Sequence, residues 1–334
     1  MNREETFLNI ISKTLTNSSF LGDDCAYLKE YNLAVSTDTL VQDVHFKYGV
    51  EAGTISSYEL GKKALLVNIS DIVASGAKPE YLTVSLSGNL DKDFIEGFYK
   101  GADEICKEYD LKIIGGDLTG GNKISVSVTI FGSTKGRNIS SRSGAKDDYI
   151  VLLAGEHGSS AVGLKILSDR IDKPPSKRLL QKNIHGERLP YKEDVRKAFI
   201  KAHIEPKLFP EISKTVATKC KKEYAMMDTS DGLYDAMKKI SESSNVGFRI
   251  NYDKIPKKNC VLEDGTTVPD FNTVLFGGED FGLLICISRE DFEAAKDELI
   301  SFGAVEIGTT AADKKILIDN KEINEDLRFE HFKK

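Results

Sequence analysis

Aspartates stand beside small or hydroxyl-bearing residues at several points of the 334-residue chain. In "MDTSDGL", Asp228 and Asp231 are three positions apart, with two hydroxyls between them and Gly232 directly after. Hard divalent cations take oxygen ligands, and magnesium combines one or two carboxylates with waters and substrate phosphates. These residue types therefore favour a site for magnesium and phosphate. Six such acidic segments are present: "LGDDCA" (Asp23, Asp24), "VSTDTL" (Asp38), "NISDI" (Asp71), "IIGGDLTGG" (Asp117), "MDTSDGL" (Asp228, Asp231) and "FGGEDFG" (Glu279, Asp280).

Each acidic segment also has a purely structural interpretation. Asp228 or Ser230 could cap a helix that starts at Gly232, and the glycine pairs at 115–116 and 277–278 could supply positive φ in turns. Taken alone, a single segment is better explained by a cap or a turn than by a ligand site, because short motifs often match by chance. Six together weaken that explanation, because carboxylates brought close must be neutralised by a cation or by protonation.

The usual nucleotide-binding and catalytic motifs are missing from the sequence. It contains no G-x-x-x-x-G-K-[ST], no G-x-G-x-x-G after a strand, no EF-hand loop, no H-E-x-x-H and no kinase catalytic loop. If phosphates bind, metal-bearing acids must do most of the holding. The isolated basic residues nearest the acidic segments are His45 and Arg142, each of which suits a phosphate contact or an ordinary structural role.

The elements that must position these acids alternate in the first part of the chain. Residue periodicity predicts two amphipathic helices, at 56–77 and 92–110, the first capped by Ser56 or Ser57 and carrying a Glu59–Lys63 pair at i,i+4. The segment 124–132 alternates polar and apolar residues, so we expect one of its sides to face solvent or a partner. Strands are predicted at 32–38, 80–88, 111–116 and 124–132.

The second part of the chain is predicted to be a separate domain. Residues 136–148 are rich in glycine, serine and charge, and they precede a new apolar run, so we place domains at 1–140 and 141–334. Residues 169–190 are charged and are expected to form a surface excursion. Helices are predicted at 158–170, 191–203, 207–223, 233–243 and 289–301, and strands near 149–154, 224–228, 247–251, 282–287 and 304–309.

Composition limits the classes of partner. The net charge of −6 disfavours nucleic acid and anionic membranes, which demand a basic surface. Five scattered cysteines indicate neither a disulfide framework nor a zinc site, and we expect mostly buried thiols. The first residues lack the apolar core of a signal peptide and no apolar run reaches membrane-spanning length, so we expect a cytoplasmic protein.

In this order, the segments "LGDDCA", "VSTDTLVQDVHF", "VNISDIVASGAKP", "IIGGDLTGG", "DTSDGL" and "GGEDF" resemble the thiamine-monophosphate kinase family. That family is related to aminoimidazole ribonucleotide synthetase, selenophosphate synthetase and a hydrogenase maturation factor. The resemblance implies an α/β N-terminal domain whose four-stranded sheet closes a barrel across a homodimer, and a C-terminal α+β domain with a mixed sheet. It also implies ATP-dependent phosphorylation of thiamine monophosphate to thiamine diphosphate, with several Mg²⁺ ions around the triphosphate.

Carried over position by position, the resemblance assigns roles to particular residues, with Asp71 and Asp228 the most critical. Implied metal ligands are Asp24, Ser36, Thr37, Asp38, Asp71, Asp117, Asp228 and Asp231. Implied nucleotide contacts are Tyr99, Gly116, Asp117, Arg142 and Ser230. Implied substrate contacts are His45, Glu279 and an aromatic residue, Phe329, with Phe332 close by.

The chain departs from the family pattern at two places, and two alternatives stay open. After "GGD" the usual arginine is missing, which leaves Lys123 as its only replacement, and Phe281 and Gly282 follow "GGED". One alternative is a related ATP-dependent enzyme with another acceptor, although the reactive cysteines that selenophosphate synthetase and the hydrogenase factor need are absent. The other is a nucleotide- or metal-binding module without turnover.

Overall fold

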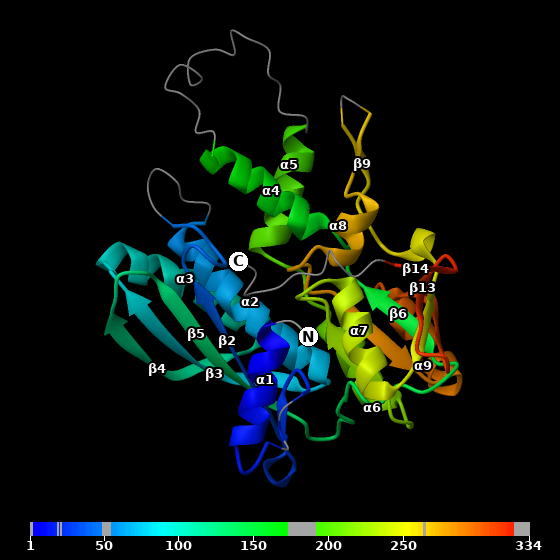
Figure 1. Ribbon diagram of the computed structural model, residues 1–334. Coiled ribbons are helices and arrows are strands. Elements are labelled where there is room, and N and C mark those ends of the chain that lie inside the picture. Colours follow the sequence, from blue (N-terminus) through cyan, green and yellow to red (C-terminus); the bar gives the residue numbers. More distant parts are fainter. Residues whose placement is uncertain are drawn as a thin grey trace.

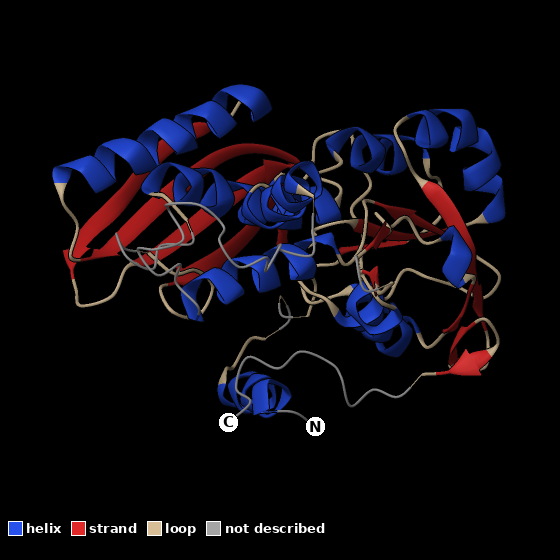
Figure 2. Cartoon of the chain, turned by 90° about the horizontal axis from the view of Figure 1, so that it is seen from above, coloured by secondary structure: helices blue, strands red, loops and turns tan. Residues whose placement is uncertain are grey.

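The chain folds into a mixed α/β protein of two domains, each built on its own mixed sheet (Figure 1). This computed structural model describes residues 3–18, 20, 22–48, 55–172, 192–262 and 265–323. Seen from above, the two sheets lie side by side with helices between and around them (Figure 2). Most of the expected surface excursion at 169–190 lies outside the described residues, as do Phe329 and Phe332.

The first sheet has five strands in the order β1-β2-β5-β3-β4, all from the first 133 residues. The strand pairs are antiparallel except β3 with β4, which run parallel. Four long strands were expected; the fifth, β1, is only three residues long, too short to show a period of two. The strands are β1 (Ala26–Leu28), β2 (Leu33–Val41), β3 (Lys78–Gly88), β4 (Lys112–Gly120) and β5 (Ser125–Ser133).

Alternation along β5 buries one side of the sheet and leaves the other open, as its sequence predicts. Val126, Val128 and Ile130 are fully buried, whereas the serines and threonines between them are half-exposed. Helices α2 (Ser57–Ser75) and α3 (Lys92–Tyr109) cover the buried side (Figure 1). The open side carries small polar side chains, and Thr39 and Ser127 hydrogen-bond across it at 2.7 Å between their hydroxyls.

Helix α2 is the central element of the molecule, because it packs on the first sheet and also on β7 of the second. Ser56 caps it, with Glu59 completing a capping box, and Gly76 ends it in the left-handed conformation. The expected Glu59–Lys63 pair is wrong: Glu59 turns back to Ser56, while Lys63 pairs with Glu279 of the other domain. Tertiary packing has overridden the local i,i+4 pattern.

The second sheet has seven strands in the order β14-β13-β8-β12-β6-β11-β7. Only β13 and β8 run parallel in it. Its central strands β6 and β11 are buried along their whole length. The strands are β6 (Ile150–Ala154), β7 (Ala225–Asp228), β8 (Gly247–Ile250), β11 (Leu283–Ile287), β12 (Val305–Ala311), β13 (Ile316–Ile318) and β14 (Lys321–Glu322).

The helices of the second part match the expected periodic segments. They are α4 (Ser159–Asp172), α5 (Glu193–Ile204), α6 (Pro210–Lys219), α7 (Leu233–Ser244) and α9 (Arg289–Ser301). Further elements that the sequence did not predict are the strands β13 and β14, α1 (Arg3–Thr14), α8 (Phe271–Phe276) and the short hairpin of β9 (Cys260–Val261) with β10 (Thr267–Val268). The five cysteines are free and four are buried. Within the described residues, no helix is long and apolar enough to cross a membrane.

Candidate functional site

A cavity of about 690 Å³ opens where the two domains meet, and most of the predicted site residues line it. β2 and α2 supply its wall from the first domain. The loops after β7 and before β11 supply the wall from the second, and α4 adds apolar side chains such as Leu164 and Leu167. Acidic residues gather at one end, while Glu279, Lys63 and His203 form a separate group.

Asp71 reaches the cavity from α2. Its Oδ2 accepts a hydrogen bond of 2.6 Å from the Ser36 hydroxyl on β2, which joins the helix to the sheet. Strand alternation places Asp38 on the same side of β2 as Ser36, whereas Thr37 points to the open side and contacts Thr129. Burial raises the pKa of Asp71 well above its usual range, and the nearby charges of other aspartates add to this.

Asp228 ends β7 and is 1% exposed. The Ser70 hydroxyl of α2 donates to its Oδ2 at 2.7 Å, and the Ser230 hydroxyl donates to its Oδ1 at 2.8 Å. Burial raises the pKa of Asp228, although these two hydroxyls oppose the shift. Neither Asp228 nor Ser230 caps the following helix, because its N-cap is Gly232, without a side-chain hydrogen bond. The cap interpretation of this segment is therefore wrong.

Asp24 approaches from the segment before β1. Arg142 Nη2 donates to its Oδ1 at 2.6 Å, and the Arg142 backbone N–H donates to Asp23 at 2.8 Å. The Cys25 thiol donates to the Asp71 carbonyl, which keeps this segment beside α2. Burial raises the pKa of Asp24 to about 6 even though Arg142 lowers it.

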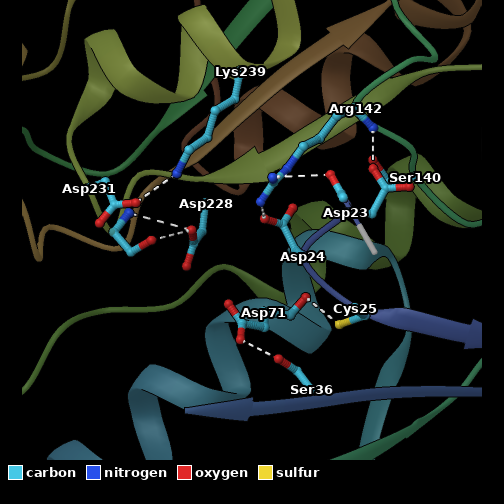
Figure 3. Close-up of polar contacts among 12 residues, drawn as sticks. Asp23, Asp24, Cys25, Ser36, Asp71, Ser140, Arg142, Asp228, Asp231 and Lys239 are labelled. Atoms are coloured by element: carbon cyan, nitrogen blue, oxygen red, sulfur yellow. Dashed lines mark hydrogen bonds and ion pairs between the residues drawn. The ribbon is translucent and has the colours of Figure 1, made fainter. Parts of the chain in front are cut away.

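Asp24, Asp71 and Asp228 thus face a common space from three separate segments (Figure 3). At its edge Asp231 pairs with Lys239 at 2.7 Å. Within the described part of the chain, no three His, Cys, Asp or Glu side chains are grouped closely enough to hold a metal ion by themselves. The donors are nevertheless hard oxygens whose carboxylates repel one another, which is the chemistry that a divalent cation relieves. The donor set fits magnesium, with phosphate oxygens or water completing the coordination.

Two loops of the second domain are fastened together beside this space. The Thr229 N–H donates to the Gly282 carbonyl at 3.0 Å, and the Gly282 N–H donates to the side-chain hydroxyl of Thr229 at 2.9 Å. The buried His157 ring lies 3.0 Å from the same hydroxyl. Glu279 N–H donates to the Ser230 carbonyl at 2.6 Å. The loop that carries Asp228 is therefore held in register with the loop that carries Glu279.

The Glu279 side chain lines the cavity, and the backbone of Glu279 itself is left-handed, with φ at 63°. The turn therefore takes its positive φ at Glu279 and not at Gly277 of the glycine pair 277–278, where φ is −67°. Glu279 Oε2 lies 3.2 Å from Lys63 Nζ and 3.2 Å from His203 Nδ1. Burial alone would raise the pKa of Glu279, but the charge of Lys63 and the imidazoles of His203 and His45 hold it below its usual range.

Comparison with known proteins places this arrangement in a family. Residues 22–134 match the family described as AIR synthase related protein, N-terminal domain, and residues 205–319 match its C-terminal domain. The thiamine-monophosphate kinase of Buchnera aphidicola subsp. Schizaphis graminum is 31% identical over 337 residues, covering 98% of this chain and 96% of that protein. The chain belongs to the thiamine-monophosphate kinase family. The family resemblance expected from the acidic segments is confirmed.

Two further relatives agree with this membership. The thiamine-monophosphate kinase of Bacillus subtilis is 33% identical over 299 residues, covering 87% of this chain and 85% of that protein. The solved structure of AaThiL complexed with AMPPCP and TMP is 28% identical, with a TM-score of 0.78, and covers 97% of this chain and 96% of that chain. The two-domain fold with mixed sheets is therefore the thiamine-monophosphate kinase fold.

Three residues that the family resemblance assigns to the nucleotide do not line the cavity of a single chain. Tyr99 lies on α3 and packs edge-on against Phe98. Gly116 and Asp117 lie on β4, at the edge of the first sheet, where Asp117 Oδ2 accepts a hydrogen bond from Thr119. The replacement cation Lys123 pairs with Asp43 at 3.3 Å. Phe329, an expected substrate contact of the family, lies outside the described residues.

Four residues of the site were missed in the sequence. Lys63 and Ser70 are on α2, and Lys63 precedes Asp71 by eight residues, a spacing that places both on one helix face and could have been read. Lys239 is on α7 and follows Asp231, which precedes that helix, by eight residues. His203 offered no local signal, because its partners Lys63 and Glu279 are far away in the sequence.

Proposed function

We propose that this chain transfers the γ-phosphate of ATP to the phosphate of thiamine monophosphate, giving thiamine diphosphate and ADP. The observation that carries the proposal is one cavity lined both by the acidic residues Asp24, Asp71 and Asp228 and by Glu279. It is supported by the related AaThiL, which has been solved complexed with AMPPCP and TMP. An ATP analogue and a thiamine phosphate match the two kinds of group that such a cavity can hold.

The acids are proposed to hold magnesium around the triphosphate. When bound, magnesium neutralises phosphate charge and aligns the reacting groups. Asp71 and Asp228 are central because they come from different domains and line the same cavity, Asp71 half-buried and Asp228 fully buried. Asp117 lies on β4, away from the cavity of its own chain, and is proposed to serve the site of a second copy. The full set of proposed ligands is Asp24, Ser36, Thr37, Asp38, Asp71, Asp117, Asp228 and Asp231.

The acceptor requires no general base from the protein. A phosphate monoester has a second pKa of about 6 and is mostly a dianion at neutral pH. The main obstacle is the approach of two polyanions. Arg142 and Ser230 lie against the acids and are proposed to contact the nucleotide phosphates, because a guanidinium and a hydroxyl both donate to phosphate oxygens. In-line geometry and charge neutralisation then account for catalysis.

The opposite group of cavity residues is proposed to hold the organic part of the acceptor. Glu279 offers a carboxylate to its nitrogen-rich head, and His45 lies close enough to affect the pKa of Glu279. Apolar side chains of α4, such as Leu164 and Leu167, line the same cavity and suit the flat faces of heteroaromatic rings.

We further propose a homodimer, formed through the open side of the first sheet, in which the sheets of two chains close a barrel. Support comes from the row of small polar residues on that side and from the position of Asp117 away from the cavity. A second copy would then complete the nucleotide site. The boundary near residue 140 is likewise a proposal, supported by the gap between β5, which ends at Ser133, and β6, which begins at Ile150.

The decisive experiment incubates the pure protein with ATP, magnesium and thiamine monophosphate. We expect equal amounts of thiamine diphosphate and ADP, resolved by liquid chromatography. Omitting magnesium, or replacing the acceptor by unphosphorylated thiamine, should give no diphosphate. Product with a different phosphate acceptor alone would favour a related enzyme, and nucleotide binding without any turnover would favour a regulatory module; either result would overturn the proposal.

A further inference from the structure

Lys63 places an almost inaccessible ammonium group beside Glu279 in the wall of the cavity. Its side chain is 1% exposed, whereas that of Glu279 is 26% exposed and faces the cavity. Lys63 Nζ donates to Glu279 Oε2 at 3.2 Å across the two domains. A buried ammonium is costly in free energy unless it is paired. The contact therefore neutralises the Lys63 charge and also holds the Glu279 carboxylate in place.

His203, on α5, bridges the same pair of groups. Its Nε2 lies 3.4 Å from Lys63 Nζ, and its Nδ1 lies 3.2 Å from Glu279 Oε2. Burial and the charge of Lys63 lower the pKa of His203 to about 4, so the ring is neutral at neutral pH. Because an ammonium only donates, Nε2 must accept from Lys63, and Nδ1 then carries the ring proton. Nδ1 lies between the Ser160 hydroxyl, at 3.0 Å, and Glu279 Oε2, at 3.2 Å.

All of these contacts reach Glu279 through one oxygen, Oε2. The other oxygen, Oε1, makes no hydrogen bond to any side chain in the described ranges and remains available to a ligand. The backbone is fixed as well, because Glu279 N–H donates to the Ser230 carbonyl at 2.6 Å. Position and charge of the carboxylate are therefore set before a ligand arrives, which is what preorganised recognition requires.

Helix α2 also sets the distance between the two ends of the cavity. Lys63, Val67 and Asp71 follow one another at intervals of four residues on one helix face, and all three line the cavity. Eight residues of α-helix span about 12 Å. Helix α2 thus carries Asp71 at the phosphate end of the cavity and Lys63, the partner of Glu279, at the opposite end.

We propose that Lys63 and His203 are positioning residues that hold Glu279 ionised and aimed for the cationic, N–H-bearing head of the acceptor, at a length fixed by α2. This inference rests on the proposed function and adds a determinant of acceptor specificity to it. Lys63 acts through the carboxylate, because its ammonium is paired with Glu279 Oε2 and its side chain is 1% exposed, whereas that of Glu279 is 26% exposed. Neither residue acts on the phosphates, so they influence acceptor binding without influencing the nucleotide.

The test is a double-mutant cycle with Lys63→Met, Glu279→Gln and the combined variant. We expect Lys63→Met to raise the KM for thiamine monophosphate by about ten- to a hundredfold, as for a lost charge-assisted hydrogen bond. The KM for ATP should stay within about threefold. In the Glu279→Gln background, Lys63→Met should have no further effect on the KM for thiamine monophosphate, because its target is gone.

Two matched comparisons keep the test sharp. Lys62→Met removes the neighbouring lysine of α2, which pairs with Glu104 and Glu205 instead, and should leave both KM values unchanged. His203→Leu removes both bridging contacts, whereas His203→Gln keeps an acceptor and a donor and should restore much of the loss. If Lys63→Met fails to fold, the comparison of His203→Leu with His203→Gln tests the proposal in its place.

Several outcomes would overturn the inference. They are equal changes in the KM for ATP and for thiamine monophosphate, an unchanged effect of Lys63→Met in the Glu279→Gln background, or equal behaviour of the two His203 variants. Failure of the proposed function is distinct, because the parent protein would then not convert thiamine monophosphate. Calorimetric titration with thiamine monophosphate then serves as the readout, and a parent protein that does not bind it would refute the inference too.

Discussion

The Ser70 hydroxyl on α2 donates to Asp228 Oδ2 at the end of β7, at 2.7 Å, and so joins the two domains inside the site. Removing this hydroxyl leaves a buried carboxylate oxygen without its donor. We expect Ser70→Ala to lower kcat/KM by about tenfold and to reduce the unfolding free energy by about 1.5–3 kcal/mol. Steady-state kinetics and urea denaturation measure both effects.

Ser75 offers a matched control for Ser70 on the same helix. It is also buried, but its hydroxyl donates to the Ile72 carbonyl of α2 itself. Ser75→Ala should leave kcat/KM unchanged and cost less stability. Equal loss of activity in the two variants would show that the Ser70–Asp228 contact has no special role.

Gly116 and Gly115 are neighbours on β4 with opposite tolerance of a side chain. A Cβ at Gly116 would lie 1.8 Å from the Val84 carbonyl oxygen, whereas a Cβ at Gly115 would meet nothing closer than Thr83 Cγ2 at 3.9 Å. Gly116→Ala should therefore reduce the unfolding free energy by about 1–3 kcal/mol or more. Gly115→Ala should be neutral or stabilise by up to about 1 kcal/mol. Urea denaturation measures the unfolding free energy of both variants. Equal midpoints would contradict the predicted clash at Gly116.

Local periodicity explains why much of the fold could be predicted from the sequence. The alternation of β5 and the helical spacing of α2 are properties of single segments, and they are preserved in the structure. Strands of two or three residues, such as β1 and β13, are too short to show a period. The Glu59–Lys63 pair failed for the opposite reason, because a partner in the other domain took the lysine.

The candidate site was predictable in its acids but not in their supports. Each acidic segment is marked locally by its aspartate and its small neighbours. The supporting contacts are long-range: Ser70 and Asp228 are 158 residues apart, and Lys63 and Glu279 are 216 apart. No local pattern can report which helix face will meet which loop, since that depends on how the domains pack.

The position of Asp117 on the edge strand predicts complementation between inactive variants. If a second chain completes the nucleotide site, Asp117→Asn and Asp228→Asn proteins, each inactive alone, should regain activity when refolded together. Random pairing leaves one intact site in half of the dimers, so about a quarter of the parent activity is expected from the symmetry of the dimer. Thr129→Arg, on the open side of the first sheet, should give a monomer in sedimentation and abolish the regain. No regain from a mixture of folded dimers would exclude a shared site.

Asp280 predicts how stability changes with pH. It is buried and accepts hydrogen bonds from the backbone N–H groups of Gly158 and Ser160, yet burial raises its pKa to about 7. A carboxyl whose folded pKa is raised contributes stability that is present below its unfolded pKa and is lost as the pH rises through the folded value. We therefore expect the unfolding free energy to fall between about pH 4 and 7, by at most about 1.4 kcal/mol per unit from this group.

Asp280→Asn isolates this contribution from those of the other buried acids. The amide does not titrate, so the difference in unfolding free energy between the parent and the variant should change between about pH 4 and 7, with the parent losing relative stability as the pH rises and the difference levelling off above the folded pKa. Urea denaturation at each pH gives this difference. A difference that is constant with pH would show that Asp280 does not titrate in this range.

Asp71→Asn separates the chemistry of the site from its stability. The Asn carbonyl oxygen can still accept the hydrogen bond from Ser36, while repulsion from Asp228 and Asp24 disappears. Turnover should therefore fall below detection, whereas the unfolding free energy should be unchanged or higher. Magnesium with a non-hydrolysable ATP analogue should raise the Tm of the parent and have a smaller effect on the variant. Asp297→Asn, at an exposed position of α9, is the control and should keep full activity. Activity of Asp71→Asn within a few-fold of the parent at saturating magnesium would refute its assignment as a metal ligand, because a carboxylate that coordinates the ion cannot be replaced by a neutral amide without weakening that coordination.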